Sequence, residues 1–375
     1  MKQKKYFTEL ESLRGIAALM ICIFHVGHWK VYQNNSVVPN LDLFVDFFFV
    51  LSGFVITYNF SKNVIDGNSY KSYLIKRFFR LYPLFFVASI PYFFVSVLKT
   101  YFHVEIFQYA NYFNFADLLF YITLTYKWGF VKGLIFNQAA WSISIEWLLY
   151  ILAGLVFLLK RKRTVNMAIS IFLALLSIVI LALTTPGLNK SESLVLRGLF
   201  SFFLGSLIAY WFNGKETTLS ISKKVTGLAR WFYLIVTMVC LVALFWLVGK
   251  QPAVSFSFPF LWAAIIYLFI TNRYPRPALQ FLNYRYILYL GTISYSYYLI
   301  HPIMIFVTEK IFKKDTLVNN TAMSIVATFV YVGFTITIAS LSYKFVELPG
   351  KDLYKLVKTG KKTLETKEAK ASKQV

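Results

Sequence analysis

The chain alternates between long apolar runs and short polar loops, which is the pattern of a protein that crosses a membrane repeatedly. A helix that spans the hydrocarbon core needs about 20 mainly apolar residues. Ten segments meet this requirement: residues 12–29, 42–60, 82–98, 142–159, 168–184, 194–212, 231–248, 254–271, 286–309 and 321–344. Because an even number of crossings returns the chain to its starting side, we predict an all-α membrane bundle of about ten transmembrane helices with both termini on one side.

The distribution of basic residues indicates which side that is. Lys and Arg accumulate in the cytoplasmic loops of membrane proteins. With both termini cytoplasmic, the segments on that side hold about three times as many Lys and Arg as the outer loops. The sequence therefore predicts cytoplasmic termini. No small-residue cleavage site follows the first apolar run, so we interpret it as a retained helix and not as a signal peptide.

Residues 99–141 do not fit this pattern of full-length spans. Their one compact apolar run, residues 115–126, is about 18 Å long as a helix, which is too short to cross comfortably. We therefore expect an interfacial or re-entrant element there. In this interpretation residues 1–350 form a single integral membrane domain. The basic tail, residues 351–375, is expected to be cytoplasmic and disordered because it has little apolar content.

Composition excludes several classes of protein. Of the 375 residues, 58% are hydrophobic and only 15% are charged, whereas about a quarter of the residues of a soluble domain are charged. The net charge of +23 would suit a nucleic-acid-binding protein. However, the basic residues lie in short loops, where the asymmetry of the bilayer explains them, so no nucleic-acid partner is expected. Cys22 and Cys240 both lie in apolar runs and indicate neither a disulfide framework nor a metal–thiolate site.

Ionisable residues within the apolar runs are the first candidates for a functional site, because they are costly at membrane depth and usually face the bundle interior. Ten residues separate Arg14 from His25 in the first run, which places both on one helix face, about 16 Å apart along the axis. Arg14 is expected near the cytoplasmic mouth with Glu11 as its partner, and His25 in the outer half. The alternative is a structural histidine and an arginine that extends to the interface.

Further polar residues fall at the outer level of the predicted bundle. They are Asp46 on the second span, Trp141, Ser142 and Glu146 at the start of the fourth, and Ser294, Tyr298 and His301 on one face of the ninth. Glu146 is the carboxylate that we expect to act with His25 as a catalytic residue. It would either orient the imidazole or hold the substrate that reacts with it. A structural hydrogen-bonding role is the alternative for each of these residues.

Basic residues gather at the inner level instead. Arg77, Arg80 and Tyr82, at the start of the third predicted span, join Arg14 at the cytoplasmic mouth. Glu347 ends the last span nearby. Such arginines can bind the phosphates of a cytosolic ligand, although the positive-inside rule alone also explains them. The acid–base residues His25 and Glu146 are thus expected in the outer half of the bundle, and the arginines in the inner half. This arrangement suggests a cosubstrate that docks from the cytoplasm and reacts deep within the bundle.

Motifs that do not occur in the sequence narrow the chemistry. It contains no Walker loop, no dinucleotide-binding glycine-rich turn and no His-Glu-x-x-His motif. ATP-driven transport, Rossmann-type oxidoreduction and zinc proteolysis are therefore disfavoured, and no metal site is expected. A histidine with a carboxylate suits acyl transfer, because imidazole can deprotonate an attacking hydroxyl. A thioester donor makes a covalent nucleophile on the protein unnecessary.

Six motifs, in order along the chain, resemble those of the acyltransferase 3 family of integral membrane acyltransferases, which includes O-acetyltransferases of cell-envelope polysaccharides. They are residues 11–18 followed by His25, 48–54, 77–83, 141–147, 294–302 and 345–349. The resemblance implies acetyl-CoA or another acyl-CoA as donor substrate, no permanently bound cofactor, His25 as the catalytic residue and Arg14 in the donor site. Some members carry an extracytoplasmic esterase-like domain after an extra helix; this sequence does not, so we expect a step on such a domain to require a separate protein.

These inferences combine into one expected mechanism. Arg14, Arg77 and Arg80 hold the CoA nucleotide, and Tyr82 completes this donor site. The pantetheine arm extends between the helices, and His25 deprotonates a hydroxyl of an envelope glycan or glycolipid that enters from the outer side. The expected location is a bacterial plasma membrane. A transporter or flippase of a lipid-linked sugar and a non-catalytic envelope scaffold are the alternatives. The identity of the acceptor, the choice between acetyl and succinyl, and the oligomeric state are left open by the sequence.

Overall fold

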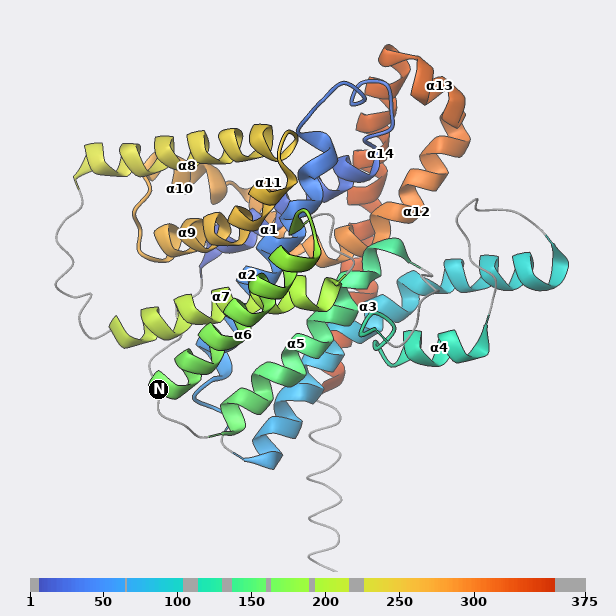
Figure 1. The fold of residues 1–375 in the computed structure, drawn as a ribbon. Helices are drawn as coiled ribbons and strands as arrows, with labels where there is room; N and C mark the ends of the chain where they lie inside the picture. The colour runs from blue at the N-terminus through green and yellow to red at the C-terminus, as the bar shows by residue number, and fades with distance from the viewer. Residues whose placement is uncertain are drawn as a thin grey trace, which may run out of the picture.

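The computed structural model describes residues 7–64, 66–103, 114–129, 137–159, 163–188, 193–215 and 226–354, and every regular element within them is helical (Figure 1). The α-helices are α1 (Thr8–His25), α2 (Phe44–Phe60), α3 (Gly67–Phe102), α4 (Phe115–Ile122), α5 (Trp141–Leu158), α6 (Arg163–Thr184), α7 (Leu194–Lys215), α8 (Gly227–Val248), α9 (Phe258–Ile270), α10 (Arg276–Leu282), α11 (Arg285–Thr292), α12 (Ser294–Phe312), α13 (Lys314–Asn319) and α14 (Thr321–Ser342). Short 3₁₀-helices cover Val38–Leu43, Gln138–Ala140 and Pro252–Ser257, and a π-helical turn, Tyr343–Glu347, follows α14.

Most of the predicted spans are present as single helices. Eight helices in the described part of the chain are long and apolar enough to cross a membrane, and α11 with α12 makes a ninth if the two are taken as one span. The remaining predicted span is α1, an 18-residue helix that carries Glu9, Glu11 and Arg14 and is therefore less apolar. The prediction of an all-α polytopic membrane bundle is confirmed, with eight or nine apolar spans in the described residues where about ten were expected.

The predicted ninth span, residues 286–309, is present as two helices and not as one continuous helix. α11 ends at Thr292 and α12 begins at Ser294, with a bend of 75° between them. The bend coincides with close packing of α11 against α1. A Cβ added to Gly291 would lie 2.1 Å from a backbone oxygen of α1, and one added to Gly15 would lie 2.5 Å from the backbone nitrogen of residue 291. α11 therefore touches α1 backbone to backbone, and α12 leaves this contact in a new direction.

The third span begins well before the predicted start at residue 82, because Asp66 caps α3. Its Oδ1 accepts a hydrogen bond of 2.7 Å from the backbone nitrogen of Ser69, and the backbone nitrogen of Asp66 donates to Ser69 Oγ at 3.0 Å. This capping box fixes the helix start. Arg77 and Arg80 consequently lie about 15–20 Å along α3 from its first residue. They therefore lie well inside α3 and not at its start.

The chain between α3 and α5 contains a short helix that does not span. α4 has eight residues, and Tyr121 on it stacks on Phe85 of α3 with the ring centroids 4.8 Å apart. The Tyr121 hydroxyl also lies 2.7 Å from Ser89 Oγ, so α4 is held against α3 (Figure 1). Residues 104–113 and 130–136 lie outside the described residues, as does the chain beyond residue 354. The disordered tail is predicted from residue 351, but residues 351–354 are helical, which corrects its start; for the remainder of these segments the predictions stay predictions.

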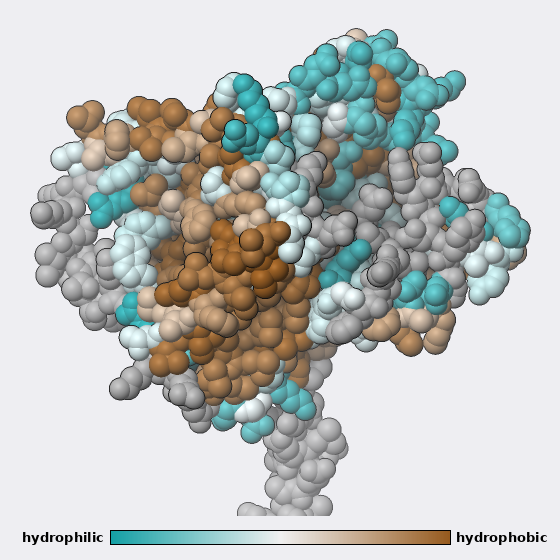
Figure 2. Space-filling model, viewed as in Figure 1, coloured by the Kyte–Doolittle hydropathy of each residue, from teal (hydrophilic) through white to brown (hydrophobic). Residues whose placement is uncertain are grey.

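The outward faces of α6, α8 and α14 are apolar. Their exposed side chains include Phe172, Leu175, Leu183, Trp231, Phe232, Val242 and Phe329. Figure 2 shows a broad hydrophobic surface over α5 and α6, with hydrophilic patches above and below it in the view. Soluble proteins rarely expose so large an apolar patch. We conclude that these faces contact lipid.

Two glycines allow α2 and α7 to touch. A Cβ added to Gly53 would lie 1.9 Å from the backbone oxygen of Phe202, and a Cβ added to Gly205 would lie 1.9 Å from the backbone oxygen of Val50. No other residue type fits at this distance without moving a helix. The contact fixes the height and rotation of α2, and with them the position of Ser52 beside the cavity described below.

Candidate active site

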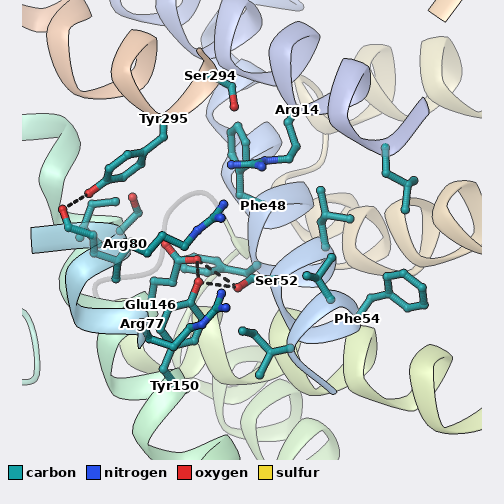
Figure 3. A pocket seen from close by; sticks show the side chains of 18 of the residues that line it. Arg14, Phe48, Ser52, Phe54, Arg77, Arg80, Glu146, Tyr150, Ser294 and Tyr295 are labelled. Carbon is teal, nitrogen blue, oxygen red and sulfur yellow. Dashed lines mark hydrogen bonds between the residues drawn. The ribbon is translucent and has the colours of Figure 1, made fainter. Parts of the chain in front are cut away.

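A cavity of about 340 Å³ lies between α1, α2, α3, α5 and α12. This volume falls within the usual range of small-molecule sites, about 300–1,000 Å³. The predicted site residues that line it are Glu11, Arg14, Arg77, Arg80, Ser142, Glu146, Ser294 and Tyr298. Figure 3 labels five of them: Arg14, Arg77, Arg80, Glu146 and Ser294. The tertiary structure thus brings most of the predicted site, drawn from helices far apart in the sequence, to one cavity.

Three arginines face this cavity from two helices. Arg14 lies on α1, where its Nη1 is 3.4 Å from Glu11 Oε1. Arg77 lies on α3 with its guanidinium 4.6 Å from the centre of the Phe60 ring, and its buried Nε has no hydrogen-bond partner within the described residues. Arg80 lies one turn further along α3, and the three guanidinium groups point into the same space in Figure 3. Because guanidinium groups suit phosphate recognition, this part of the cavity is a candidate anion site.

Glu146 lies among these arginines and not beside His25. Its Oε1 accepts hydrogen bonds from Ser52 Oγ at 3.0 Å and from the hydroxyl of Tyr150, one turn later on α5. Figure 3 shows the carboxylate between the side chains of Arg77 and Arg80 of α3. No hydrogen bond joins Glu146 to His25 in the described part of the chain. The expectation that Glu146 shares the level of His25 and orients its imidazole is therefore corrected.

His25 has a different neighbour, His301 of α12. The two ring centroids are 4.7 Å apart, and His301 Nε2 lies 3.3 Å from His25 Nδ1. His25 Nδ1 also lies 2.9 Å from the backbone oxygen of Ile21, and His301 Nδ1 lies 2.6 Å from that of Tyr298. His301 is fully buried, whereas His25 is partly exposed. Among the described residues, Nε2 of His25 has no hydrogen-bond partner, so it can accept a proton.

The histidine pair lies just beyond the wall of the cavity. Tyr298 belongs to that wall, and its ring centroid is 5.7 Å from that of His301 and 6.0 Å from that of Phe48. The Tyr298 hydroxyl donates to the backbone oxygen of Ala139 at 2.8 Å and lies 2.9 Å from Ser142 Oγ. Tyr298 is thus a hydrogen-bonded wall residue that lies next to His301.

Two more predicted residues lie where the start of α12 meets the segment that follows α14. Ser294 is the first residue of α12, and its buried Oγ has no hydrogen-bond partner within the described residues. Glu347 accepts hydrogen bonds of 2.6 Å from Ser296 Oγ and from Lys351 Nζ. Glu347 therefore ties the start of α12 to the segment that follows α14.

The remaining predicted residues do not line the cavity. Tyr82 stacks on Phe78 with the ring centroids 4.4 Å apart, so its predicted place in the donor site is corrected. Asp46 is fully buried and pairs with Arg197 of α7, with Oδ2 2.7 Å from Nη2. The ring of Trp141 lies 5.7 Å from the same guanidinium.

Sequence reasoning missed three residues of these clusters. Ser52 and Tyr150 bind the carboxylate of Glu146, and Arg197 neutralises Asp46. Each carried a usable signal: Ser52 lies within a motif, Tyr150 follows Glu146 by one turn, and Arg197 is an ionisable residue inside an apolar run, where a counter-charge is expected.

Comparison with known proteins identifies the kind of protein to which this site belongs. A family model described as an acyltransferase domain matches residues 7–344. The chain belongs to this acyltransferase family. The resemblance found in the sequence motifs is thereby confirmed, and the chain is a multi-pass membrane protein.

Two of the acyltransferase relatives described here are similar over most of the chain, and a third over nearly half of it. O-acetyltransferase OatA of Staphylococcus aureus is 26% identical over 376 residues, which cover 93% of this chain and 58% of that protein. Peptidoglycan O-acetyltransferase OatA of Listeria monocytogenes is 26% identical over 375 residues, covering 92% of this chain and 56% of that protein. A putative acetyltransferase, ORF330, of Acidianus two-tailed virus is 25% identical over 173 residues, 46% of this chain and 47% of that protein. The chain therefore spans a little over half the length of the two OatA proteins. No solved structure matches it.

Proposed function

We propose that this member of the acyltransferase family is a membrane O-acyltransferase that moves an acetyl or related acyl group from acyl-CoA to a hydroxyl of a cell-envelope glycan or glycolipid. The observation that carries the proposal is the imidazole of His25, whose Nε2 has no hydrogen-bond partner among the residues that the structure describes and lies just beyond a cavity lined by three arginines. We propose the bacterial plasma membrane as its location, with both termini in the cytoplasm.

The cavity supports an acyl-CoA donor. Arg14, Arg77 and Arg80 would bind its phosphates, since guanidinium groups form paired hydrogen bonds with phosphate oxygens. We assign Glu146 to this donor site, where its negative charge reduces the repulsion between neighbouring arginines. In this proposal the acyl end of the donor extends past Tyr298 to reach His25.

The chemistry proposed for His25 is general base catalysis. Nε2 removes the proton of the acceptor hydroxyl while the hydroxyl oxygen attacks the carbonyl carbon of the thioester. The new C–O bond replaces the C–S bond, and the departing CoA thiolate takes up the proton from His25. The step needs no covalent intermediate on the protein because the thioester is already activated.

The names of the relatives support the acceptor class. Two of them are named O-acetyltransferases, and the Listeria protein is named for peptidoglycan. We therefore propose an envelope glycan as acceptor and peptidoglycan as the first one to test.

Transfer of label from acyl-labelled acetyl-CoA to envelope glycan, in membranes that contain the protein, tests the proposal. We compare the wild type with His25→Ala and with His103→Asn, at matched protein levels. His103 is an exposed histidine at the end of α3 with φ of 54°, a conformation that Asn tolerates. We expect His25→Ala to lose about 100-fold or more of the transfer rate, and His103→Asn to keep it.

Two outcomes contradict the proposal in different ways. Equal transfer by His25→Ala and the wild type would exclude His25 as the base. No transfer by the wild type with either acetyl-CoA or succinyl-CoA would exclude the acyltransferase and favour a transporter of a lipid-linked sugar.

A further inference from the structure

We propose that His301 is a positioning residue for the reaction: it holds His25 in the tautomer whose Nε2 can act as the base, and it stabilises His25 once the imidazole is protonated. This inference rests on the proposed function, in which His25 is the general base. It extends that function by assigning the orienting role to a second, neutral imidazole, where a carboxylate had been expected.

The hydrogen bonds of the pair determine both tautomers. A backbone carbonyl can only accept, so the nitrogen that lies 2.9 Å from Ile21 O, which is His25 Nδ1, carries a hydrogen. The same argument places a hydrogen on His301 Nδ1, 2.6 Å from Tyr298 O. In two neutral imidazoles, Nε2 of each ring then carries a lone pair.

The lone pair of His301 Nε2 meets the N–H group of His25. The two nitrogens are 3.3 Å apart, so the Nδ1–H of His25 is shared between Ile21 O and the His301 ring. No carboxylate pairs with either imidazole in the described ranges of the chain; the one His–carboxylate pair there joins His28 to Glu309. His301 is therefore the side-chain acceptor available to orient His25.

The hydrogen bond to His301 matters most after His25 has taken the proton from the hydroxyl that receives the acyl group. The imidazolium donates from Nδ1 to a neutral nitrogen, and a hydrogen bond from a charged donor is about twice as strong as one between neutral groups. In Ser-His-Asp enzymes a buried carboxylate does this for the histidine. A neutral imidazole does the same without burying a negative charge, which is costly inside a membrane protein.

The position of His301 is itself fixed by packing. It is fully buried, and the turn of α12 that carries it is held on both sides. The Tyr298 hydroxyl donates to Ala139 O at 2.8 Å, and Asn137 Nδ2 donates to Leu299 O at 2.9 Å. The segment before α5 therefore clamps α12 at the level of the histidine pair, which leaves His301 little freedom to turn away from His25.

Steady-state acyl transfer by purified protein in lipid nanodiscs tests the role of His301. His301→Leu removes the acceptor with little loss of volume, and His301→Gln restores an oxygen that can reach the position of Nε2. We expect His301→Leu to lower kcat about tenfold or more with KM for acetyl-CoA unchanged, and His301→Gln to recover most of kcat. His103→Asn is the matched control, and thermal unfolding of each variant reports whether it is folded.

Three results would overturn the proposal: full kcat in folded His301→Leu, equal loss of kcat in the Leu and Gln variants, or an effect confined to KM.

If the wild type shows no transfer, the proposed function fails. In that case ¹⁵N NMR of the histidines still tests whether His25 and His301 form a hydrogen bond. We expect the His25 signal, assigned by its loss in His25→Gln, to report a protonated Nδ1 in the wild type and to change in His301→Leu. A His25 signal with a protonated Nε2, or one that His301→Leu does not alter, would contradict the assignment independently of activity.

Discussion

At the scale of single residues, buried charges in this bundle are matched across helices. Asp46 of α2 receives two hydrogen bonds from Arg197 Nε, at 3.1 and 3.2 Å, and one from its Nη2 at 2.7 Å. Ser201 Oγ donates to the same carboxylate at 3.0 Å, and Asp42 Oδ2 lies 3.2 Å from Arg197 Nη1. A charge buried without such partners is costly. The pair therefore belongs to the scaffold that holds α2 against α7, and we assign it no part in the chemistry.

Asp46→Ala should destabilise the protein strongly, because it leaves the guanidinium of Arg197 with one remaining carboxylate. Removing one partner of a buried pair costs about 3–5 kcal/mol, and we expect the lower end because Asp42 remains. Thermal unfolding in detergent measures the effect. Asp315→Ala, at an exposed position in the first turn of α13, is the control and should change stability by about 0.5 kcal/mol or less. Equal melting temperatures for the two variants would contradict the scaffold role.

At the scale of helices, two glycine contacts set the geometry of the site. Gly53 and Gly205 let α2 cross α7 at backbone distance, and Gly15 and Gly291 do the same for α1 and α11. The second contact coincides with the 75° bend that starts α12. These contacts bring the cavity-facing side chains of α1, α2 and α12 together. The site therefore depends on small residues that touch no ligand.

Gly205→Ala should separate α2 from α7, because the new Cβ would lie 1.9 Å from the backbone oxygen of Val50. Overpacking of this kind costs about 1–3 kcal/mol, and the shift of α2 should weaken the hydrogen bond from Ser52 to Glu146 and lower acyl transfer. Gly333→Ala on α14 is the control, since nothing lies within 4 Å of its added Cβ; it should be neutral or stabilising by about 1 kcal/mol. Thermal unfolding and label transfer are measured for both. If Gly205→Ala matched Gly333→Ala in both measurements, the close crossing would not be needed.

At the scale of the whole molecule, the bundle has two distinct ends. Phe7 and Tyr58 lie at one end, with ring centroids 6.0 Å apart. At the other end, the backbone nitrogen of Lys30 donates to the backbone oxygen of Leu317 in α13 at 2.9 Å. The arginines of the cavity and the two histidines lie between these ends. His25 is about 16 Å further along α1 than Arg14, which suits the proposed reaction, in which donor and acceptor arrive from opposite sides.

Cysteine labelling tests the predicted orientation of these ends. In a Cys240→Ser background, Asp315→Cys should react with a membrane-impermeant maleimide in intact cells. Lys62→Cys should react only after the membrane is permeabilised, because it lies in the loop between α2 and α3 on the predicted cytoplasmic side. Both positions are exposed, and the remaining Cys22 is buried. The reverse pattern would invert the orientation, and labelling of both in intact cells would contradict the placement of the two loops on opposite sides.

The sequence by itself determined the class of fold and most members of the site. Apolar runs of membrane-spanning length follow directly from the cost of unpaired backbone groups in lipid, so the helical type of the spans and their approximate positions could be predicted locally. The same cost explains why Arg14, Arg77, Arg80, Glu146 and His25 stood out, since an ionisable residue in an apolar run needs a partner or a ligand.

Only the tertiary structure decided which of these residues meet. Spacing along one helix tells which residues share a face and how far apart they lie along the axis. The position of one helix relative to another depends on caps, glycine contacts and bends between elements. Asp66 starts α3 early, and the packing of α3 against α5 places the arginines beside Glu146. The bend before Ser294 directs α12 so that His301, and not a carboxylate, reaches His25. Pairing between helices is a property of packing, and packing depends on contacts between residues that no local pattern connects.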